Sequence, residues 1–243
     1  MSAQAGYTSD LSVDETLLLE ELDFQPISFV MGSSFYHVGY TLASWSKNEE
    51  MPKLTLAMEI AREYAMRRLI KQAHEVGADG VVGMRLEVDH KEHHAEFIAT
   101  GTAVRAPSKD WRVDGAPFTS DLNGQDFWAL VRAGYRPRGL VFGNCVYHVA
   151  HQSLGQWMGR MGNNCEMPNF TQALYDAREL AMERMQAAAE RVGGTGIVGV
   201  NVSEGSYGWH SHVIELFAVG TAICASGGAH EHEPIEPILS ATR

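Results

Sequence analysis

The second half of this sequence repeats the first half in order, and this repeat limits the chain to a duplicated architecture. The segment Thr8-Ser9-Asp10-Leu11 recurs as Thr119-Ser120-Asp121-Leu122. Other matches follow in the same order: Pro26 with Pro137, Gly32 with Gly143, Tyr36-His37 with Tyr147-His148, Met51-Pro52 with Met167-Pro168, and Gly101-Thr102-Ala103 with Gly220-Thr221-Ala222. Chance does not preserve order and spacing in this way, so we expect two copies of one small domain.

The repeat also gives the expected domain boundaries. We expect a first domain over residues 7–106 and a second over residues 118–225. Residues 107–117 between them begin and end with proline and are interpreted as a short linker. Residues 226–243 carry two glycines and two prolines and are expected to be a mobile tail.

The order of hydrophobic patterns in each copy is strand, helix, strand, strand. Ser12-Val13-Asp14-Glu15 fits a capping box, which predicts a short acidic helix before the first strand. Residues 25–41 are rich in aromatic and β-branched side chains and predict a strand, or strand pair, bent at Gly32. A long helix is expected from Pro52 to Gly77, because apolar residues recur there in steps of three and four. This stripe and its copy in the second half are Leu54, Met58, Ala61, Ala65, Leu69, Ala73, Val76 and Phe170, Leu174, Ala177, Ala181, Met185, Ala189, Val192.

Two strands follow the helix. Met84, Leu86 and Val88 alternate with charged residues, which is typical of a half-buried strand. The returning strand, residues 96–104, is apolar or neutral on both faces after its first residue. Either another subunit contacts it or the chain itself covers both faces of its sheet. The predicted fold class is α+β, with two tandem β-α-β-β domains that form two-layer α/β sandwiches.

Composition excludes several partners. The formal net charge is −11 and the basic residues form no stripe, which argues against a nucleic-acid partner. The sequence contains no apolar run long enough to cross a bilayer and no leader-like start, so no membrane association is expected. The three cysteines are an odd number without Cys-x-x-Cys spacing, which favours a reducing compartment. We therefore expect a cytoplasmic protein.

Glycines and cysteines offer little catalytic chemistry. Gly77, Gly80 and Gly83 lie between a helix and a strand, whereas a phosphate-binding loop lies between a strand and a helix. They are therefore interpreted as a helix end and a tight turn. Cys145 lies near His148, but the first copy has no equivalent cysteine, so we interpret it as a buried small side chain or an oxidisable thiol rather than a nucleophile.

Histidines provide the candidate metal ligands. His90 and His93 lie in the hairpin of the first copy, and His210 and His212 lie two apart in the second, where a strand would place both on one face. A divalent transition metal is the expected cofactor if any is bound, although the spacing matches no established metal motif and the alternative is a solvated hairpin. The methionines of residues 157–161 are a second possible set of soft ligands or a packing feature.

The repeated signature resembles the YbjQ-like family, which is described as "putative heavy-metal-binding". The signature is a helix with Ala-Arg-Glu, then Gly-x-x-Gly-x-Val-Gly, then two strands ending in Gly-Thr-Ala, and it covers residues 25–105 and 136–225. The resemblance implies β-α-β-β domains that join through their strands and hairpins into five-fold rings. It implies no agreed set of metal ligands.

These observations lead to two functional expectations. The first is a self-assembling, non-enzymatic homo-oligomer. Because a duplicated chain cannot alternate evenly round a five-membered ring, its rings would stack or be bridged into a closed shell. The second is a metal-binding or metal-responsive module with His, Met or Cys ligands. An enzyme is not expected, since the sequence offers no nucleophile–base pair, phosphate loop or metal-ligand motif.

Overall fold

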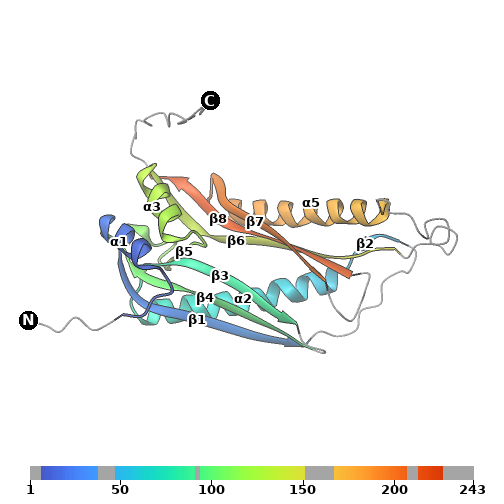
Figure 1. Ribbon diagram of the computed structural model, residues 1–243, viewed down its shortest axis with the longest axis horizontal. Coiled ribbons are helices and arrows are strands. Elements are labelled where there is room, and N and C mark those ends of the chain that lie inside the picture. Colours follow the sequence, from blue (N-terminus) through green and yellow to red (C-terminus); the bar gives the residue numbers. More distant parts are fainter. Residues whose placement is uncertain (1–6, 38–46, 91–93, 151–166, 207–212, 227–243) are drawn as a thin grey trace, which may run out of the picture.

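The computed structural model describes residues 7–37, 47–90, 94–150, 167–206 and 213–226. It contains two four-stranded sheets that run along the long axis of the molecule (Figure 1). The predicted α+β class and the repeated β-α-β-β order are both confirmed.

Helices and strands of the first half follow the expected pattern. They are α1 (Val13–Glu21), β1 (Gln25–His37), β2 (Glu49–Glu50), α2 (Pro52–Glu75), β3 (Gly80–His90) and β4 (His94–Arg105). The second half, after a short 3-10 helix η1 (Lys109–Trp111), contains β5 (Phe118–Thr119), α3 (Gly124–Arg132), β6 (Tyr135–His148), α5 (Pro168–Arg191), β7 (Gly196–Ser206) and β8 (Val213–Ala225).

Each sheet contains one short strand from the other half of the chain. The first sheet has the order β1-β4-β3-β5 and the second β2-β6-β8-β7. The three long strands of each sheet pair antiparallel, whereas β5 runs parallel to β3. The two halves are therefore joined through exchanged strands as well as through side-chain packing.

Local sequence signals explain the ends of the helices. The capping box predicted at Ser12 is present: the Ser12 hydroxyl accepts from the Glu15 amide at 3.2 Å, and the Ser12 amide donates to the Glu15 carboxylate at 2.7 Å. α2 begins with Pro52 and is followed by Gly77, whose φ of +77° is a conformation that favours glycine. Val76, expected on the apolar stripe, instead lies beyond the end of α2 and is exposed.

Small residues bring each long helix close to its sheet. A Cβ atom at Gly32 of β1 would lie 2.1 Å from the backbone oxygen of Ala65 in α2. The second half repeats this contact, with Gly143 of β6 at 2.1 Å from the oxygen of Ala181 in α5. Glycine is required at both positions because any side chain there would force the helix off the sheet.

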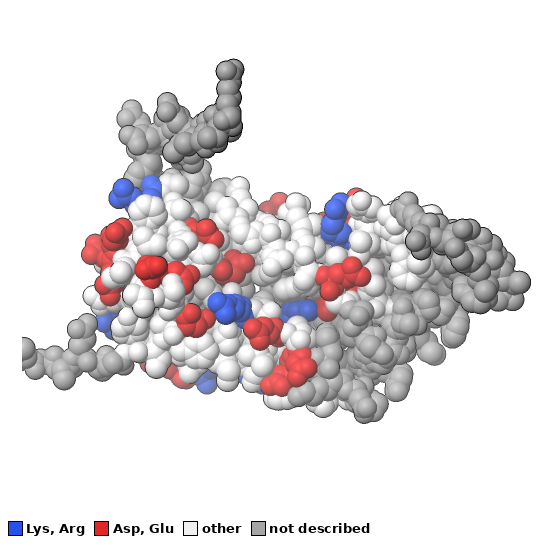
Figure 2. Space-filling view, in the orientation of Figure 1, with Lys and Arg blue, Asp and Glu red and all other residues white. Residues whose placement is uncertain are grey.

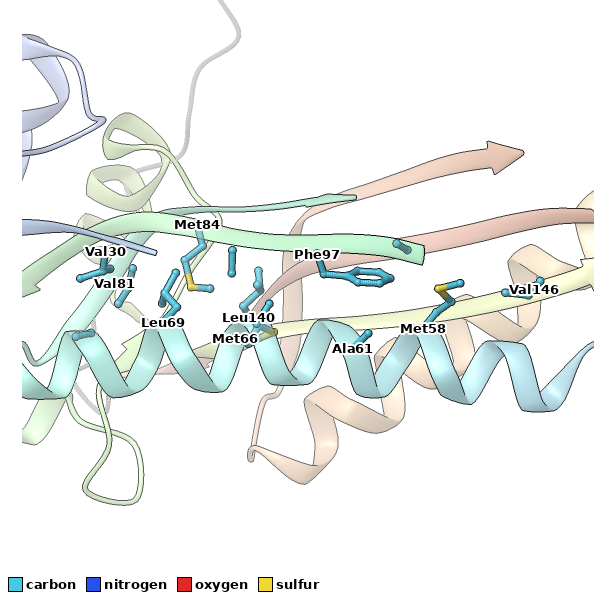
Figure 3. Close-up of a cluster of buried hydrophobic side chains, with 14 of the residues drawn as sticks. Val30, Met58, Ala61, Met66, Leu69, Val81, Met84, Phe97, Leu140 and Val146 are labelled. Atoms are coloured by element: carbon cyan, nitrogen blue, oxygen red, sulfur yellow. The ribbon is translucent and has the colours of Figure 1, made fainter. Parts of the chain in front are cut away.

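The hydrophobic core is continuous across the two halves. α2 packs on β1 and β4 of the first sheet and also on β6 of the second, whereas α5 packs on β6 and β8. Figure 3 shows Leu140 and Val146 of β6 lying among the core side chains of the first half, near Met58 and Phe97. α2 is thus covered on two sides by the chain.

An aromatic cluster fills the end of the molecule near α1 and α3 (Figure 1). Phe24 packs edge-on against Trp111 at 4.8 Å and Phe127 at 5.2 Å between ring centroids. Trp111 belongs to the segment that the sequence predicts as a linker, and its side chain is buried. The junction between the halves is therefore a packed part of the structure.

Candidate functional site

The predicted metal ligands cannot be assembled into a site from the described residues. His93, His210 and His212 lie outside those residues, as do the methionine segment 157–161 and Cys165. His90 is the last residue of β3, and its side chain is not among those described. Within the described ranges, no three His, Cys, Asp or Glu side chains are grouped so that they could hold a metal ion.

Cys145 is a buried thiol in the core between β6 and α5. Burial, together with the charge of Glu50, raises its pKa to about 12. It therefore stays protonated near neutral pH and is a poor nucleophile. The neighbouring Tyr147 and His148 have structural contacts: the Tyr147 hydroxyl donates to Asp176 at 3.3 Å, and a His148 ring nitrogen donates to the backbone oxygen of Lys47 at 3.2 Å.

Polar contacts connect the two halves of the chain, and we call this set of contacts the joint. Its first part is the addition of a short segment to a strand edge. Residues 118–122 of the second half lie along the edge of β3. The Ser120 amide donates to the oxygen of Val81 at 3.0 Å, and the Met84 amide donates back to the oxygen of Ser120 at 2.9 Å. These backbone bonds cover an edge that would otherwise present unpaired donors and acceptors.

The second part of the joint attaches the start of α2 to β6. β2 pairs with the end of β6, and the Met51 amide then donates to the oxygen of Val146 at 2.8 Å. One turn into α2, the Thr55 hydroxyl accepts from the Val146 amide at 3.0 Å. The side-chain amide of Asn144 donates to the Thr55 oxygen at 3.1 Å. The edge of β6 is therefore occupied by the first half of the same chain.

At the centre of the joint lies a buried ion pair between α2 and β8. The guanidinium of Arg62 donates to the carboxylate of Glu215 at 2.7 Å, and both side chains are almost fully buried. The guanidinium also lies 4.3 Å from the ring centre of Phe217 and 5.2 Å from that of Phe97. Removing either residue would leave the other buried without its opposite charge, which is strongly destabilising.

Asp79 holds the junction segment against the first half. Its carboxylate accepts from Lys109 at 2.6 Å, from Arg112 at 2.8 Å and from the Ala106 amide at 3.2 Å. Burial alone would raise the pKa of Asp79, but the hydrogen bonds from Lys109 and Arg112 outweigh it and hold the pKa below its ordinary value. The ionised form therefore holds the junction segment against the first half.

Apolar side chains are exposed on the outer strand of each sheet. Met31 and Phe35 on β1 of the first half are exposed, and so are Val200 and Val202 on β7 of the second. Isolated exposed apolar residues are normal, but these lie in pairs along the outer strands of their sheets. In the other copy the residues equivalent to Phe35 and Val200 are Val146 and Met84, and both are buried. The sequence repeat alone does not predict this difference.

These features define a class: an α+β tandem-repeat protein whose described polar network serves mainly to join one repeat to the other. A family model described as "Putative heavy-metal-binding" matches residues 47–107 and 135–226, which together make up more than half of the chain. The chain belongs to this YbjQ-like family as a tandem member.

Relatives of two kinds match the chain. "Encapsulin nanocompartment protein Rv1762c" of Mycobacterium tuberculosis is 44% identical over 238 residues, covering 96% of this chain and 91% of that protein. A UPF0145 protein of Methanococcus maripaludis is 34% identical over 93 residues, which is 35% of this chain but 83% of the relative. A UPF0145 protein of Bacillus velezensis is 33% identical over 75 residues, covering 30% and 68% of the two chains. The short relatives therefore match a region about the size of one repeat, and the long relative matches nearly the whole chain.

In the part of the chain that the structure describes, no helix is long and apolar enough to cross a membrane.

Figure 2 shows acidic side chains spread over the viewed face with fewer basic ones, in keeping with the formal net charge of −11.

Proposed function

We propose that this protein is a structural, non-enzymatic subunit that assembles with copies of itself into a large homo-oligomer. Its units are residues 7–106 and 118–225, joined by residues 107–117. The assembly is built on five-fold rings, which either stack or close into a shell, and it forms in the cytoplasm without nucleic acid. A closed, symmetric assembly is the usual outcome for a homo-oligomer.

One observation carries this proposal: the 44% identity to a protein named as an encapsulin nanocompartment protein, with almost complete coverage of both chains. Identity at this level over the full tandem repeat supports a shared mode of assembly rather than a shared domain alone. The exposed apolar pairs on β1 and β7 support it as well, because a monomer gains nothing from leaving Phe35 or Val200 in water.

The purified protein tests this proposal by light scattering and negative-stain imaging, with reductant and a metal chelator present. We expect uniform particles many times heavier than the 26.7 kDa chain. A single species at the mass of one chain would overturn the assembly proposal.

A second candidate function is metal binding, which the description of the family favours. The ligands would come from His90, His93, His210 and His212. A His210→Ala, His212→Ala double variant tests it: loss of metal uptake measured by calorimetry supports the metal site, and unchanged uptake counts against it. Particles that form only after metal is restored would make assembly a consequence of metal binding.

A further inference from the structure

The two halves contribute different surfaces to the joint. Each half therefore also has a copy of the surface that the other half contributes, and this copy takes no part in the joint. The first half contributes α2 and the edge of β3, and the second contributes residues 118–122 and the outer faces of β6 and β8. Because the halves are copies, the second half also has a β7 edge and an α5 surface, and the first half also has residues 7–11 and the outer faces of β1 and β4. Among the described residues, no other strand pairs with β7 on its outer edge.

Residues 7–11 are held on their own sheet in the same way as residues 118–122. The Ser9 hydroxyl lies 3.0 Å from the Thr102 hydroxyl, and Ser120 lies 3.0 Å from Thr221. Backbone amides of β1 and β6 donate to Thr8 and Thr119 at 3.1 and 2.9 Å. Residues 7–11 therefore have the same orientation on their sheet as residues 118–122. In residues 118–122 this orientation presents the backbone to the edge of β3.

Each segment begins with an aromatic residue, Tyr7 in the first and Phe118 in the second, and the two have different surroundings. Phe118 lies so close over Gly80 that a Cβ atom on the glycine would be 2.1 Å from the ring, and Phe118 is 1% exposed. Its counterpart Tyr7 is 49% exposed. Gly196, the counterpart of Gly80, has nothing nearer to an added Cβ than the Ile223 side chain at 3.7 Å. The second half thus has a glycine at the position that Phe118 covers in the first half, but no aromatic ring covers Gly196.

Exposure on the flat surfaces shows the same division. Val146 on β6 is fully buried, and its counterpart Phe35 on β1 is 64% exposed. Met84 on β3 is 2% exposed, and its counterpart Val200 on β7 is 43% exposed. The two buried residues, Val146 and Met84, lie in the joint within the chain. The two exposed residues, Phe35 and Val200, lie at the matching positions of a second joint, which a single chain cannot form.

Both charged residues at the centre of the joint, Arg62 and Glu215, have a counterpart of the same type in the other half. Arg178 of α5 is the counterpart of Arg62 and is exposed, with its guanidinium 4.9 Å from the ring centre of Tyr175. Glu96 of β4 is the counterpart of Glu215 and is half-buried. A second copy placed as the first half is placed on the second would bring Arg178 to Glu96.

We propose that a second copy of this chain docks head to tail on the second half through a repeat of the internal joint. Residues 7–11 of the second copy add parallel to the edge of β7, with Tyr7 opposite Gly196 and Thr8 opposite Ile197. This register follows from the internal pairs Gly80 with Phe118 and Val81 with Thr119. The inference rests on the proposed self-assembly and names its interface. Such a contact uses different surfaces on the two chains, so its repetition gives a closed ring where the rotation between successive chains closes and an open filament where it does not. The two halves alternate along it, so a five-fold ring of this kind is a ring of five chains rather than of five halves.

Cross-linking of a Thr8→Cys, Ile197→Cys double variant with a short bismaleimide tests the register. We expect a ladder of linked chains on a denaturing gel, and none above the background of the native cysteines from either single variant. A Thr8→Cys, Ser203→Cys variant is the matched control, because Ser203 lies about 20 Å further along β7. Co-expression of the two single variants should give linked dimers and nothing larger, since each chain then carries one engineered thiol.

The outcomes separate this interface from the assembly itself. Large particles with no 8–197 ladder would overturn the interface and leave the assembly proposal standing. Linkage in the Thr8→Cys variant alone would also overturn it, because a two-fold contact would bring Thr8 to Thr8. A protein that stays at the mass of one chain would overturn the assembly proposal, and this interface with it.

A charge exchange tests the α5 side independently. We expect Arg178→Glu to raise the chain concentration needed for half-assembly at least tenfold, and Glu96→Arg in the same chain to recover most of that loss. Arg191→Glu, an exposed change on the same helix, is the control and should leave the midpoint unchanged. An Arg178→Glu midpoint equal to that of the control would overturn the placement of α5.

Discussion

β3 and β7 are the same strand in two copies of one domain, yet their surroundings differ. The edge of β3 carries residues 118–122, and Met84 on it is buried. On β7 the equivalent Val200 is exposed. The fold of a repeat and the burial of its surfaces are therefore separate properties, because burial depends on which neighbour the chain can reach.

Arg62 and Arg178 extend the comparison to the helices. The first is buried between two sheets and paired with Glu215, and the second lies on the surface beside Tyr175. The same residue type therefore stabilises the folded chain in one half and is exposed on the surface of the other. Four predictions test how far the halves are independent.

The largest effect is expected at the buried ion pair. Arg62→Met should lower the free energy of unfolding by about 3–5 kcal/mol, because it leaves the Glu215 carboxylate buried without its partner. Arg178→Met should change it by less than about 0.5 kcal/mol in the dissociated chain, since that side chain is exposed. Urea denaturation of both variants measures the contrast, and equal losses would contradict it.

The helix–sheet contact should respond alike in both halves. Gly32→Ala and Gly143→Ala each place a methyl group against helix backbone, and each should cost roughly 3 kcal/mol. Thermal unfolding followed by circular dichroism measures both. Gly115→Ala, at a glycine with open space around it, controls for the general cost of losing a glycine, although its φ of +80° adds some strain of its own. A large difference between the first two variants would show that the joint changes the packing of one helix.

Asp79 should make the first half acid-sensitive. Its pKa is lowered in the folded protein, so its stabilisation is present above the ordinary value of 3.8 and is lost as the pH falls through the lowered value. Asp79→Asn should lower stability at pH 7 and flatten its dependence on pH below 4. The second half has Thr195 at this position and should contribute no matching acid transition. Unfolding curves between pH 7 and 2.5 provide the measurement, and a wild-type slope in the variant would count against the assignment.

The smallest effect concerns the thiols. With a pKa of about 12, only about one Cys145 side chain in ten thousand is a thiolate at pH 8, so alkylation should be negligible in the folded chain. Cys224 is half-buried and should react faster. Mass spectrometry after brief iodoacetamide treatment, with and without urea, distinguishes the sites. Rapid labelling of Cys145 without urea would show that the β6–α5 core opens readily.

Much of the fold could be predicted from the sequence because its signals are local or periodic. The capping box at Ser12, the start of α2 at Pro52 and the apolar stripe from Leu54 all depend on neighbours a few residues away. The repeat then doubled every assignment. The strand over residues 96–104 was expected to have both faces covered, by another subunit or by the chain itself; in β4 α2 packs against the sheet, whereas Ile98 and Thr100 are only half-buried.

The joint could not be predicted in the same way, because its contacts lie far apart in the sequence. Nothing near Arg62 indicates that its partner is Glu215, and nothing near Phe118 indicates that it covers Gly80. The segment predicted as a linker gave no sign that Trp111 would be buried in an aromatic cluster. The candidate metal ligands stay a prediction, because most of them lie outside the described residues.

The tandem of two β-α-β-β units can be derived from the amino-acid sequence, since hydrophobic period, caps and glycine positions act over short distances. Which of the duplicated surfaces the chain buries against itself is seen in the folded structure and not in the repeat. One chain contains one junction and can form one copy of the joint, so β3 and Arg62 are buried while β7 and Arg178 are exposed. Chain connectivity explains this: two copies of one domain at different places in a chain have different neighbours within reach.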